Sequence, residues 1–571
     1  MIRPAGRFAL VLHSHLPYVL RHGRWPHGTD WLCEAVAESY LPLLRAFERL
    51  ESDGVPARLT ISFTPVLAEQ LADDGFRDEF RAWITGRRAQ LERDTKDAGQ
   101  SDPRAADLVH TWKGWLDETE RHFNSLDGQL LRAFRGLEER GRVEITTSAA
   151  THGYLPLLSL DASVELQLRT AKAAHRRHFG REPRGIWLPE CAYRPRYEWT
   201  PPIGRDAGRI RSLRLGLEEM VARHGIRWFT VDSHVALAGD PLSIYRNFYP
   251  SLAALRGYEE RFPQQPRMRS SGRSYRVRSK GAERQAVALV RDARSSLQVW
   301  SRDEGYPGHP DYLDFHRRNV ANGLRYFRVT GPGVAEKDKQ LYDVGAAERR
   351  TEEHARHFVW LLGDTLERMR SSGISDPLIV SPFDTELFGH WWFEGPLFLE
   401  HVFRHLADSG ITAATGSDEA DAESSRDEVS LLEGSWGEGG DHRAWLNKHT
   451  EWTWDRVYDA EGDVAATLAQ IAMRGAAAPA SVDRALRQAL RELMLLQSSD
   501  WQFLITTGAA RDYAERRFAT HYVELKRLLD LARRTLAGAP PDEEDDLYLS
   551  VMEKRDRCFP DVDASWFAAP R

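Results

Sequence analysis

Short apolar runs alternate with long stretches of helical periodicity over most of this 571-residue chain. Each run holds four to six residues and is rich in Ile, Val, Phe, Leu and Trp, which favour strands. Near-continuous apolar strands between helices are typical of a parallel sheet covered on both faces, and a barrel is its closed form. The pattern predicts an α/β fold with strands at residues 7–12, 59–63, 143–147, 185–188, 226–231 and 377–381.

Three stretches depart from this alternation. Residues 66–140 carry no strand signal and read as a helix-rich insertion between strands. Residues 244–290 are basic and rich in Ser, Gly and Pro, which predicts a long mobile loop. From residue 416 the chain is polar and then strongly helical. We therefore expect a catalytic barrel over residues 1–415 and a C-terminal helical domain over residues 416–571, which would complete a ligand-binding cleft.

The bulk composition narrows the class of protein. The net charge of -7 is mild, which argues against a general nucleic-acid or membrane-surface binder. The apolar run at residues 8–12 is too short for a signal peptide or a membrane span. The three cysteines form no CxxC pair and no even set, so we expect reduced thiols and a cytoplasmic protein.

Tryptophan is unusually frequent, with 18 copies, and many of them stand beside His, Asp, Glu or Gly. Core packing explains most tryptophans in most proteins. The alternative is a set of flat apolar faces for stacking sugar rings. Composition alone leaves the two interpretations open.

Two acids follow predicted strands, where parallel α/β folds place their chemistry. Glu190 comes after the strand at 185–188, and Asp384 lies in "SPFDTELFGHWWFEG" after the strand at 377–381. Glycoside chemistry needs two carboxyl groups across the scissile bond, one ionised and one protonated at neutral pH. The alternative is that both acids are ion-pair partners or helix caps.

Three histidines also stand near strand ends, namely His13, His15 and His152. Together with an acid they would suit a metal-dependent hydrolase. However, no HExxH or similar spacing supports a metal, so binding of substrate hydroxyls is the preferred interpretation.

Two later stretches carry further candidates. "GSWGEGGDHRAW" (434–445) is a glycine-rich turn with two tryptophans and no Lys-Ser/Thr of a phosphate loop, which favours carbohydrate over phosphate. "QSSDWQF" (497–503) interrupts the C-terminal helices and could bring Asp500 and Trp501 over the barrel, although helix packing explains it equally well.

Taken together, five motifs in this order resemble glycoside hydrolase family 57, and within it the enzymes that branch α-1,4-glucans. They are "HSHLPY", "THGYLPLL", "WLPECAY", "SPFDTELFGHWWFEG" and "GSWGEGGDHRAW". The resemblance extends to "VWSRDEGYPGHPDY" and "QSSDWQF", and thus over nearly the whole chain. It implies a (β/α)7 barrel with a helical insertion and a C-terminal helical domain.

The resemblance also implies a retaining double displacement on an α-1,4-glucan, without metal or other cofactor. Glu190 would be the nucleophile and Asp384 the general acid/base. The implied substrate-binding residues are His13, His15, His152, Arg291, Trp300, Gly308, Trp436, Trp445, Asp500 and Trp501.

The chain departs from the family between Tyr245 and Val290. Branching enzymes of the family carry a compact loop here, whose tyrosine helps to favour transfer over hydrolysis, whereas this chain has a longer, basic segment. Tyr245, Tyr249, Tyr258 and Tyr275 are the candidates. A 4-α-glucanotransferase or α-amylase on the same fold is the nearest competing function. A metal-dependent deacetylase and a non-catalytic glucan-binding protein are the more distant ones. The sequence predicts a glucan as partner, no nucleic acid and no membrane, and gives no oligomeric state.

Overall fold

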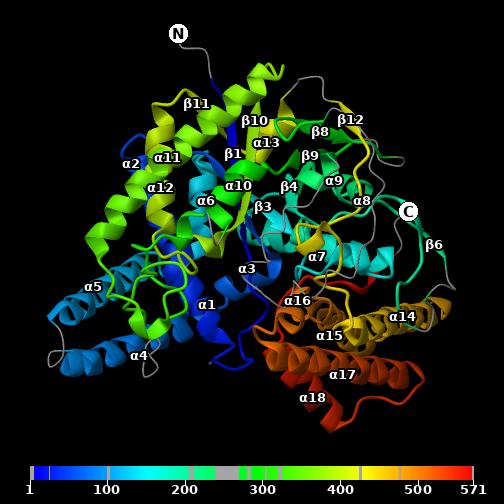
Figure 1. The fold of residues 1–571 in the computed structure, drawn as a ribbon. Helices are drawn as coiled ribbons and strands as arrows, with labels where there is room; N and C mark the ends of the chain where they lie inside the picture. Colours follow the sequence, from blue (N-terminus) through cyan, green and yellow to red (C-terminus); the bar gives the residue numbers. More distant parts are fainter. Residues whose placement is uncertain are drawn as a thin grey trace.

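We describe a computed structural model of the chain, shown in Figure 1. The structure describes residues 5–24, 26–98, 103–204, 207, 211–237, 269–279, 285–301, 305–318, 324–422, 427–474 and 478–568.

A barrel of parallel strands forms the core. All six predicted strands are present, and a seventh, β9, joins them. The strands are β1 (Gly6–Ser14), β2 (Leu59–Phe63), β3 (Val143–Ser148), β4 (Gly185–Trp187), β7 (Trp228–Val231), β9 (Val287–Val290) and β10 (Leu378–Asp384). Nearly every residue in them is buried, because helices cover one face and barrel-interior side chains fill the other.

The strand order around the barrel is β10-β1-β2-β3-β4-β7-β9, and all these neighbours pair in parallel. A parallel bridge between Arg291 and Val380 closes the ring from β9 back to β10. The amide of Asp292 also donates to the carbonyl of Val380 at 2.8 Å. The (β/α)7 barrel is therefore confirmed.

Five further strands flank the barrel sheet or stand apart from it. In the sheet, β8 (Ser274–Val277) pairs antiparallel with β9, β12 (Glu428–Val429) pairs with β8, and β11 (Ile411–Ala414) pairs with the start of β1. The hairpin of β5 (Tyr197–Trp199) and β6 (Ser212–Arg214) is separate.

Helices surround the barrel. They are α1 (Thr29–Ala35), η1 (Val36–Tyr40), α2 (Leu41–Ser52), α7 (Asp161–Phe179), α8 (Leu217–Arg223), α9 (Ser233–Leu237), α10 (Ala293–Trp300), α11 (Val344–Ser371), α12 (Gly395–Ala407) and α13 (Gly416–Asp421). Short 3-10 turns are η2 (Leu155–Leu157), η3 (Pro189–Cys191), η6 (Tyr306–Gly308), η7 (Glu336–Asp338), η8 (Thr385–Leu387), η9 (Glu438–Gly440) and η10 (Ala564–Trp566).

The stretch expected as a helical insertion, residues 66–140, is helical in its described part. It consists of α3 (Pro65–Ala72), α4 (Asp74–Ala98), α5 (Pro103–Ser125) and α6 (Leu130–Glu139). The long pair α4 and α5 projects to one side of the barrel (Figure 1).

The expectation of a loop over residues 244–290 is wrong for part of that range. Residues 274–277 and 287–290 are the strands β8 and β9, and the second of these completes the barrel. Its residues Val287–Val290 are apolar and buried, but the run is short and follows a basic, Ser- and Gly-rich stretch. Residues 244–268 lie outside the described residues.

The helical C-terminal region begins later than expected. Its helices are α14 (Glu451–Met473), α15 (Ala480–Leu496), α16 (Asp500–Thr507), α17 (Arg511–Leu536) and α18 (Glu543–Arg555). Residues 416–421 instead pack against the barrel: the amide of Ser417 donates to Glu144 of β3 at 2.8 Å. Gly416 lies so close to the Trp228 indole that an added Cβ would come within 2.2 Å of the ring.

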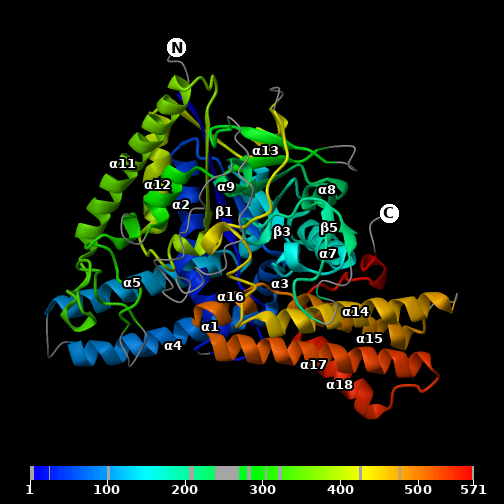
Figure 2. The same cartoon turned by 45° about the vertical axis from the view of Figure 1, so that its right-hand side comes forward.

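The insertion and the C-terminal helices lie at the same end of the barrel (Figures 1 and 2). Strand β1 begins at the opposite end, so the carboxyl ends of the parallel strands face these helices. No helix in the described part of the chain is long and apolar enough to cross a membrane.

Candidate active site

Two carboxyl groups stand where barrel strands end. Glu190 follows β4 within the turn η3, and Asp384 is the last residue of β10, in register with His13 of β1. The negative charge of Glu190 is among the charges that raise the pKa of Asp384. The two predicted catalytic acids therefore lie close enough to interact.

Glu190 is held in an unusual backbone conformation. Its φ of 61° and ψ of 25° lie in the left-handed region, which residues other than glycine adopt rarely. The Trp436 amide donates to its carbonyl at 3.1 Å, and the Trp436 indole Nε1 donates to its Oε2 at 2.8 Å. His152 Nε2 lies 3.3 Å from Oε1. These contacts fix both carboxylate oxygens, and local strain at a fixed carboxylate is typical of functional sites.

Asp384 has the properties of a proton donor. Desolvation raises the pKa of its carboxyl well above the ordinary value, and the charges of Glu386 and Glu190 raise it further. The charge of Arg291 lowers that pKa, but by less. A raised pKa is what the acid partner of a two-carboxyl site needs.

The three candidate histidines form one stack beside Glu190. The ring centroids of His15 and His152 are 4.2 Å apart, and those of His13 and His152 are 4.7 Å apart. Trp187 of β4 stacks on the other side of His13 at 4.6 Å. Burial, followed by the charges of neighbouring histidines, lowers the pKa of both His13 and His152. They are therefore neutral at pH 7, so each ring can both donate and accept one hydrogen bond.

One ring nitrogen in this stack has no partner among the residues that the structure describes. His13 Nδ1 lies 3.2 Å from the Ser62 hydroxyl, whereas its buried Nε2 contacts no partner in the described part of the chain. A buried polar atom without a partner is costly unless a ligand or water satisfies it. This supports the expectation that His13 meets a substrate hydroxyl.

The C-terminal helices contribute directly to the site through Asp500. His15 Nε2 lies 2.9 Å from both carboxylate oxygens of Asp500, at the start of α16, and His15 Nδ1 lies 3.0 Å from the Thr64 hydroxyl. Burial opposes the charge of Asp500, but His15 lowers the pKa of this carboxyl below its ordinary value. An ionised acid thus ties the helical region to the histidine stack.

Arg291 and two tryptophans line the side nearest Glu190. The Arg291 guanidinium lies over the Trp436 ring at 5.6 Å, and its Nη1 is 3.4 Å from Asp232. The centroid of Trp300 is 6.0 Å from that of Trp436 and 6.1 Å from that of Phe383. The structure thus places Arg291, Trp300 and Trp436 near the carboxyl pair, and their role in substrate binding stays a prediction.

Three other expected substrate-binding residues have no recorded contact with Glu190 or Asp384 in the described part of the chain. Trp445 is fully buried and stacks on Tyr154 at 4.4 Å. Trp501 is also fully buried in the helical region, where its Nε1 donates to the Leu495 carbonyl. Gly308 ends a turn whose Tyr306 packs on His354, and within the described residues no recorded contact joins it to the carboxyl pair.

Sequence reasoning missed a third buried carboxyl at the site, Glu386. It accepts hydrogen bonds from the Tyr40 hydroxyl and, at 3.2 Å, from the His15 amide. Burial raises the pKa of Glu386 to about 7, although these bonds oppose the shift. Its position two residues after Asp384, inside the same motif, was the signal that could have found it.

The histidine stack is not arranged as a metal site. Its rings lie face to face, with interplanar angles of 21° to 28°, rather than pointing toward one centre. Within the described residues, one group has ligand atoms within metal-binding distance of one another: Glu492, His521, Glu524 and Asp556, in the helical region. The arrangement of the stack speaks against the metal-dependent deacetylase interpretation.

An acid with a raised pKa and a fixed carboxylate lie at the strand ends of an α/β barrel, flanked by aromatic and imidazole side chains, which is the arrangement that a glycoside-processing enzyme requires. The family model "Glycosyl hydrolase family 57" matches residues 9–278, and the model "1,4-alpha-glucan branching enzyme, C-terminal" matches residues 463–567. The chain belongs to glycosyl hydrolase family 57.

Several characterised or solved proteins are similar over nearly the whole chain. The 1,4-alpha-glucan branching enzyme TK1436 of Thermococcus kodakarensis is 38% identical over 97% of this chain and 77% of its own length. Its crystal structure matches with a TM-score of 0.89, covering 99% of this chain and 97% of that one. A probable 1,4-alpha-glucan branching enzyme of Mycobacterium tuberculosis is 31% identical over 90% of both chains. The α-amylase AmyC of Thermotoga maritima is 29% identical, with a TM-score of 0.79 and 99% coverage of both chains.

Proposed function

We propose that this chain is a 1,4-α-glucan branching enzyme. It cleaves an α-1,4-glucan and transfers the released segment to a 6-hydroxyl of a glucan chain, which forms an α-1,6 branch. Similarity to branching enzymes over nearly the full length, together with a C-terminal region that matches the branching-enzyme model, supports this function. The observation that carries the chemistry is the pair of a fixed Glu190 carboxylate and a buried Asp384 whose pKa is raised well above its ordinary value.

In the first step, Glu190 attacks the anomeric carbon of the donor chain. A carboxylate oxygen forms a covalent bond to this carbon as the bond to the glycosidic oxygen breaks. Asp384 gives its proton to that oxygen, so the leaving chain departs as a neutral hydroxyl. The product is a glycosyl-enzyme ester and an ionised Asp384.

In the second step, the ionised Asp384 takes the proton of an acceptor 6-hydroxyl. The acceptor oxygen attacks the anomeric carbon, and the ester bond to Glu190 breaks. The configuration at the anomeric carbon is inverted twice and therefore retained. Asp384 is protonated again for the next cycle.

The surrounding residues position the substrate in this scheme. The Nε2 of His13, which has no partner among the described residues, suits a hydrogen bond to a hydroxyl of the sugar bound at Glu190, and His152 holds Glu190 Oε1 through its own Nε2 at 3.3 Å. Asp500 orients His15 through the contact of its carboxylate with His15 Nε2 at 2.9 Å. We propose on this basis that the C-terminal helices complete the glucan-binding cleft.

Transfer requires that an acceptor sugar, and not water, reaches the ester intermediate. Of the four tyrosines considered for this role, Tyr275 lies in β8, and its hydroxyl donates to the Ser270 carbonyl at 2.9 Å. A tyrosine bound in the sheet in this way does not act as a gate. Tyr245, Tyr249 and Tyr258 lie outside the described residues.

The second candidate function is hydrolysis of α-glucans. The similarity to the α-amylase AmyC over 99% of both chains favours it, because the same barrel and carboxyl pair serve hydrolysis when water is the acceptor. The two functions differ only in the acceptor that reaches the ester.

Incubation with amylose separates the two functions. The products are treated with a debranching enzyme, and α-1,6 linkages are counted against new reducing ends. We expect mostly α-1,6 linkages, lost in Glu190→Gln. A product of reducing ends without branches would establish the hydrolase instead.

A cytoplasmic location fits this function, and we propose it for this chain. All three cysteines, Cys33, Cys191 and Cys558, are buried and free of disulfides. Free thiols are typical of reducing compartments.

A further inference from the structure

The turn that carries His152 lies between the barrel and the helical C-terminal region. His152 has a φ of 55°, in the left-handed region that residues other than glycine adopt rarely. Its Nε2 lies 3.3 Å from Glu190 Oε1, so the backbone of this turn sets where the imidazole meets the proposed nucleophile. A residue keeps such a conformation only where its surroundings hold it. The groups that hold this turn therefore bear on the reaction.

One buried amide, that of Gln167 on α7, binds the turn from the barrel side. Gln167 Oε1 accepts from the Thr151 amide at 3.0 Å, and Gln167 Nε2 donates to the Thr151 hydroxyl at 3.0 Å. Because a backbone N–H only donates, the first bond fixes which atom of the Gln167 amide is the oxygen. Gln167 and Thr151 are both fully buried, so bulk water does not reach these bonds.

The C-terminal region binds the same turn from the other side, through the end of α15 and the residues that follow it. The Thr151 hydroxyl donates to the Met494 carbonyl at 2.5 Å. Gly153, on the other side of His152, forms an antiparallel bridge with Ser498. The C-terminal region therefore contacts the turn on both sides of the imidazole.

Gln497 connects the two sides. Gln167 Nε2 donates to Gln497 Oε1 at 3.1 Å, and Gln497 Nε2 donates to Glu461 Oε1 of α14 at 3.0 Å. The turn fits tightly against both amides, because a Cβ added to Gly153 would lie 3.1 Å from Gln167 Nε2 and 3.2 Å from the Gln497 carbonyl oxygen. Two side-chain amides thus link α7 of the barrel to α14 and α15 of the C-terminal region.

We propose that Gln167 and Gln497 are positioning residues that act on the reaction through His152. They give the C-terminal helices a role beyond completing the glucan-binding cleft, because these helices then hold the turn whose imidazole orients the Glu190 carboxylate. The inference rests on the proposed role of Glu190. Loss of Gln167 removes the side chain that pairs the buried Thr151 amide, so the turn shifts, and a shift of about 1 Å at a reacting group can cost on the order of 10²-fold in rate.

The test is a double-mutant cycle between Gln167→Met and His152→Ala. Methionine is close to glutamine in size and removes the hydrogen bonds of the amide. The initial rate of α-1,4 bond cleavage in amylose is measured, since it counts cleavage whatever the acceptor. We expect Gln167→Met to lower kcat about tenfold in the wild-type background and less than about twofold when residue 152 is alanine, because its effect passes through the imidazole. The KM for amylose should stay within about twofold of the wild-type value.

Gln488→Met is the matched control. Gln488 is a fully buried glutamine of α15, and its Nε2 donates to Glu492 of the same helix at 2.9 Å. Gln167→Met and Gln488→Met each remove a buried amide and should lower the midpoint of chemical denaturation, but only Gln167→Met should lower kcat. A loss of kcat shared by both folded variants would be a general effect of destabilisation and would overturn the proposal.

An equal loss of kcat in both His152 backgrounds would also overturn the proposal, because the amide would then act independently of the imidazole. If Gln167→Met does not fold, Gln497→Met replaces it. This variant keeps both bonds between Gln167 and Thr151, so we expect a smaller loss, of about threefold, that again disappears in His152→Ala.

The outcome of the cycle is separate from that of the proposed function. Cleavage by the wild type without α-1,6 linkages would refute the branching function and leave the cycle as a test of the two amides. Unchanged cleavage in Glu190→Gln would overturn both, because the positioning role acts through that carboxylate.

Discussion

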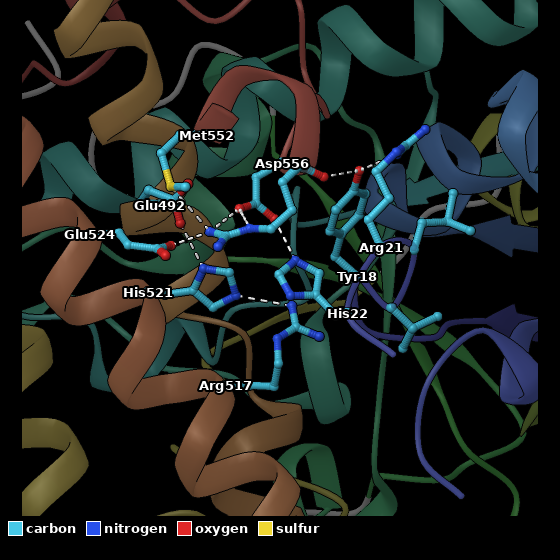
Figure 3. A network of polar contacts seen from close by, with 12 residues as sticks. Tyr18, Arg21, His22, Glu492, Arg517, His521, Glu524, Met552 and Asp556 are labelled. Carbon is cyan, nitrogen blue, oxygen red and sulfur yellow. Dashed lines mark hydrogen bonds and ion pairs between the residues drawn. The ribbon is translucent and has the colours of Figure 1, made fainter. Parts of the chain in front are cut away.

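Two buried networks of histidine and carboxyl groups lie in this molecule, and they differ in what surrounds them. In the first, His13, His15 and His152 stack between Asp500 and Glu190. In the second, His22 and His521 lie between Asp556 and Glu492, where the N-terminal segment meets the C-terminal helices (Figure 3).

The second network is saturated by arginines. Arg555 donates to Asp556 at 2.6 Å and also to Glu524, and Arg517 donates to His521 Nε2 at 3.0 Å. Because His521 Nε2 accepts a bond, the ring is neutral, and burial lowers its pKa well below the ordinary value. The Arg555 guanidinium supplies the positive charge that a metal ion would bring to these acids.

The first network contains fewer cations and opens toward a ligand. The Glu190 side chain is 16% exposed, and His13 Nε2 has no partner in the described residues. The same residue types therefore form a structural junction where arginines satisfy them and a reactive site where a partner is missing. The two networks contain the same residue types and differ in whether, among the described residues, a buried histidine nitrogen lacks a hydrogen-bond partner.

The largest expected effect is that of Glu190→Gln on the first network. The amide cannot form the ester, so branching should fall by roughly 10³- to 10⁶-fold. The rate of α-1,6 linkage formation on amylose measures this loss. Glu198→Gln, at an exposed position of β5, should retain full activity. Residual activity above a tenth of wild type would remove Glu190 from the reaction.

The next effect is that of Asp384→Asn, which removes the proton donor. We expect a loss of about 10²- to 10⁴-fold on amylose. With an α-maltosyl fluoride donor, whose leaving group needs no proton, the glycosylation step should be far less impaired. Equal defects on both donors would show that Asp384 does not act as the acid.

A substitution in the second network should lower the stability of the fold and leave the catalytic rate unchanged. Asp556→Asn leaves Arg555 and His22 without their carboxylate, which should cost about 3–5 kcal/mol of unfolding free energy. Chemical denaturation measures this cost, and Asp408→Asn on the surface is the matched control. The folded variant should keep the wild-type turnover at 25 °C. A changed turnover with unchanged stability would reverse the assignment of the two networks.

The smallest expected effect is a shift in the pH profile of Tyr40→Phe. The Tyr40 hydrogen bond lowers the pKa of Glu386, so its loss raises that pKa above about 7. Glu386 is then less charged at neutral pH and raises the pKa of Asp384 less. Asp384 should lose its proton earlier, and the alkaline limb of kcat/KM should move to lower pH. Tyr522→Phe, in the helical region, serves as control; an alkaline limb that stays in place or moves upward would exclude this coupling.

The sequence predicted most of the barrel because six of its seven strands are apolar runs between helical patterns. It did not predict β9 from the residues, since four apolar positions after a basic stretch carry too little periodicity. The resemblance to the family implied the missing strand. The local hydrophobic pattern thus predicted six strands, and the resemblance to the family predicted the seventh.

Site residues could be predicted from the sequence where their chemical type alone identifies them. They were harder to predict where the direction in which the side chain points decides whether it reaches the site. Asp500 and Trp501 are adjacent in the chain, yet Asp500 contacts His15 whereas Trp501 is buried beneath Arg517. Trp445 and Trp436 share one motif, but only Trp436 bonds Glu190. Which side of a turn faces the barrel depends on packing that these short stretches do not encode.

The most direct test of the account is to trap the ester. Asp384→Asn is incubated with α-maltosyl fluoride without acceptor, digested, and analysed by mass spectrometry. We predict a maltosyl adduct on the peptide that contains Glu190. The double variant that also carries Glu190→Gln should form no such adduct. An adduct on Glu386 or another residue, or inverted products without any adduct, would contradict the assignment of Glu190 as the nucleophile.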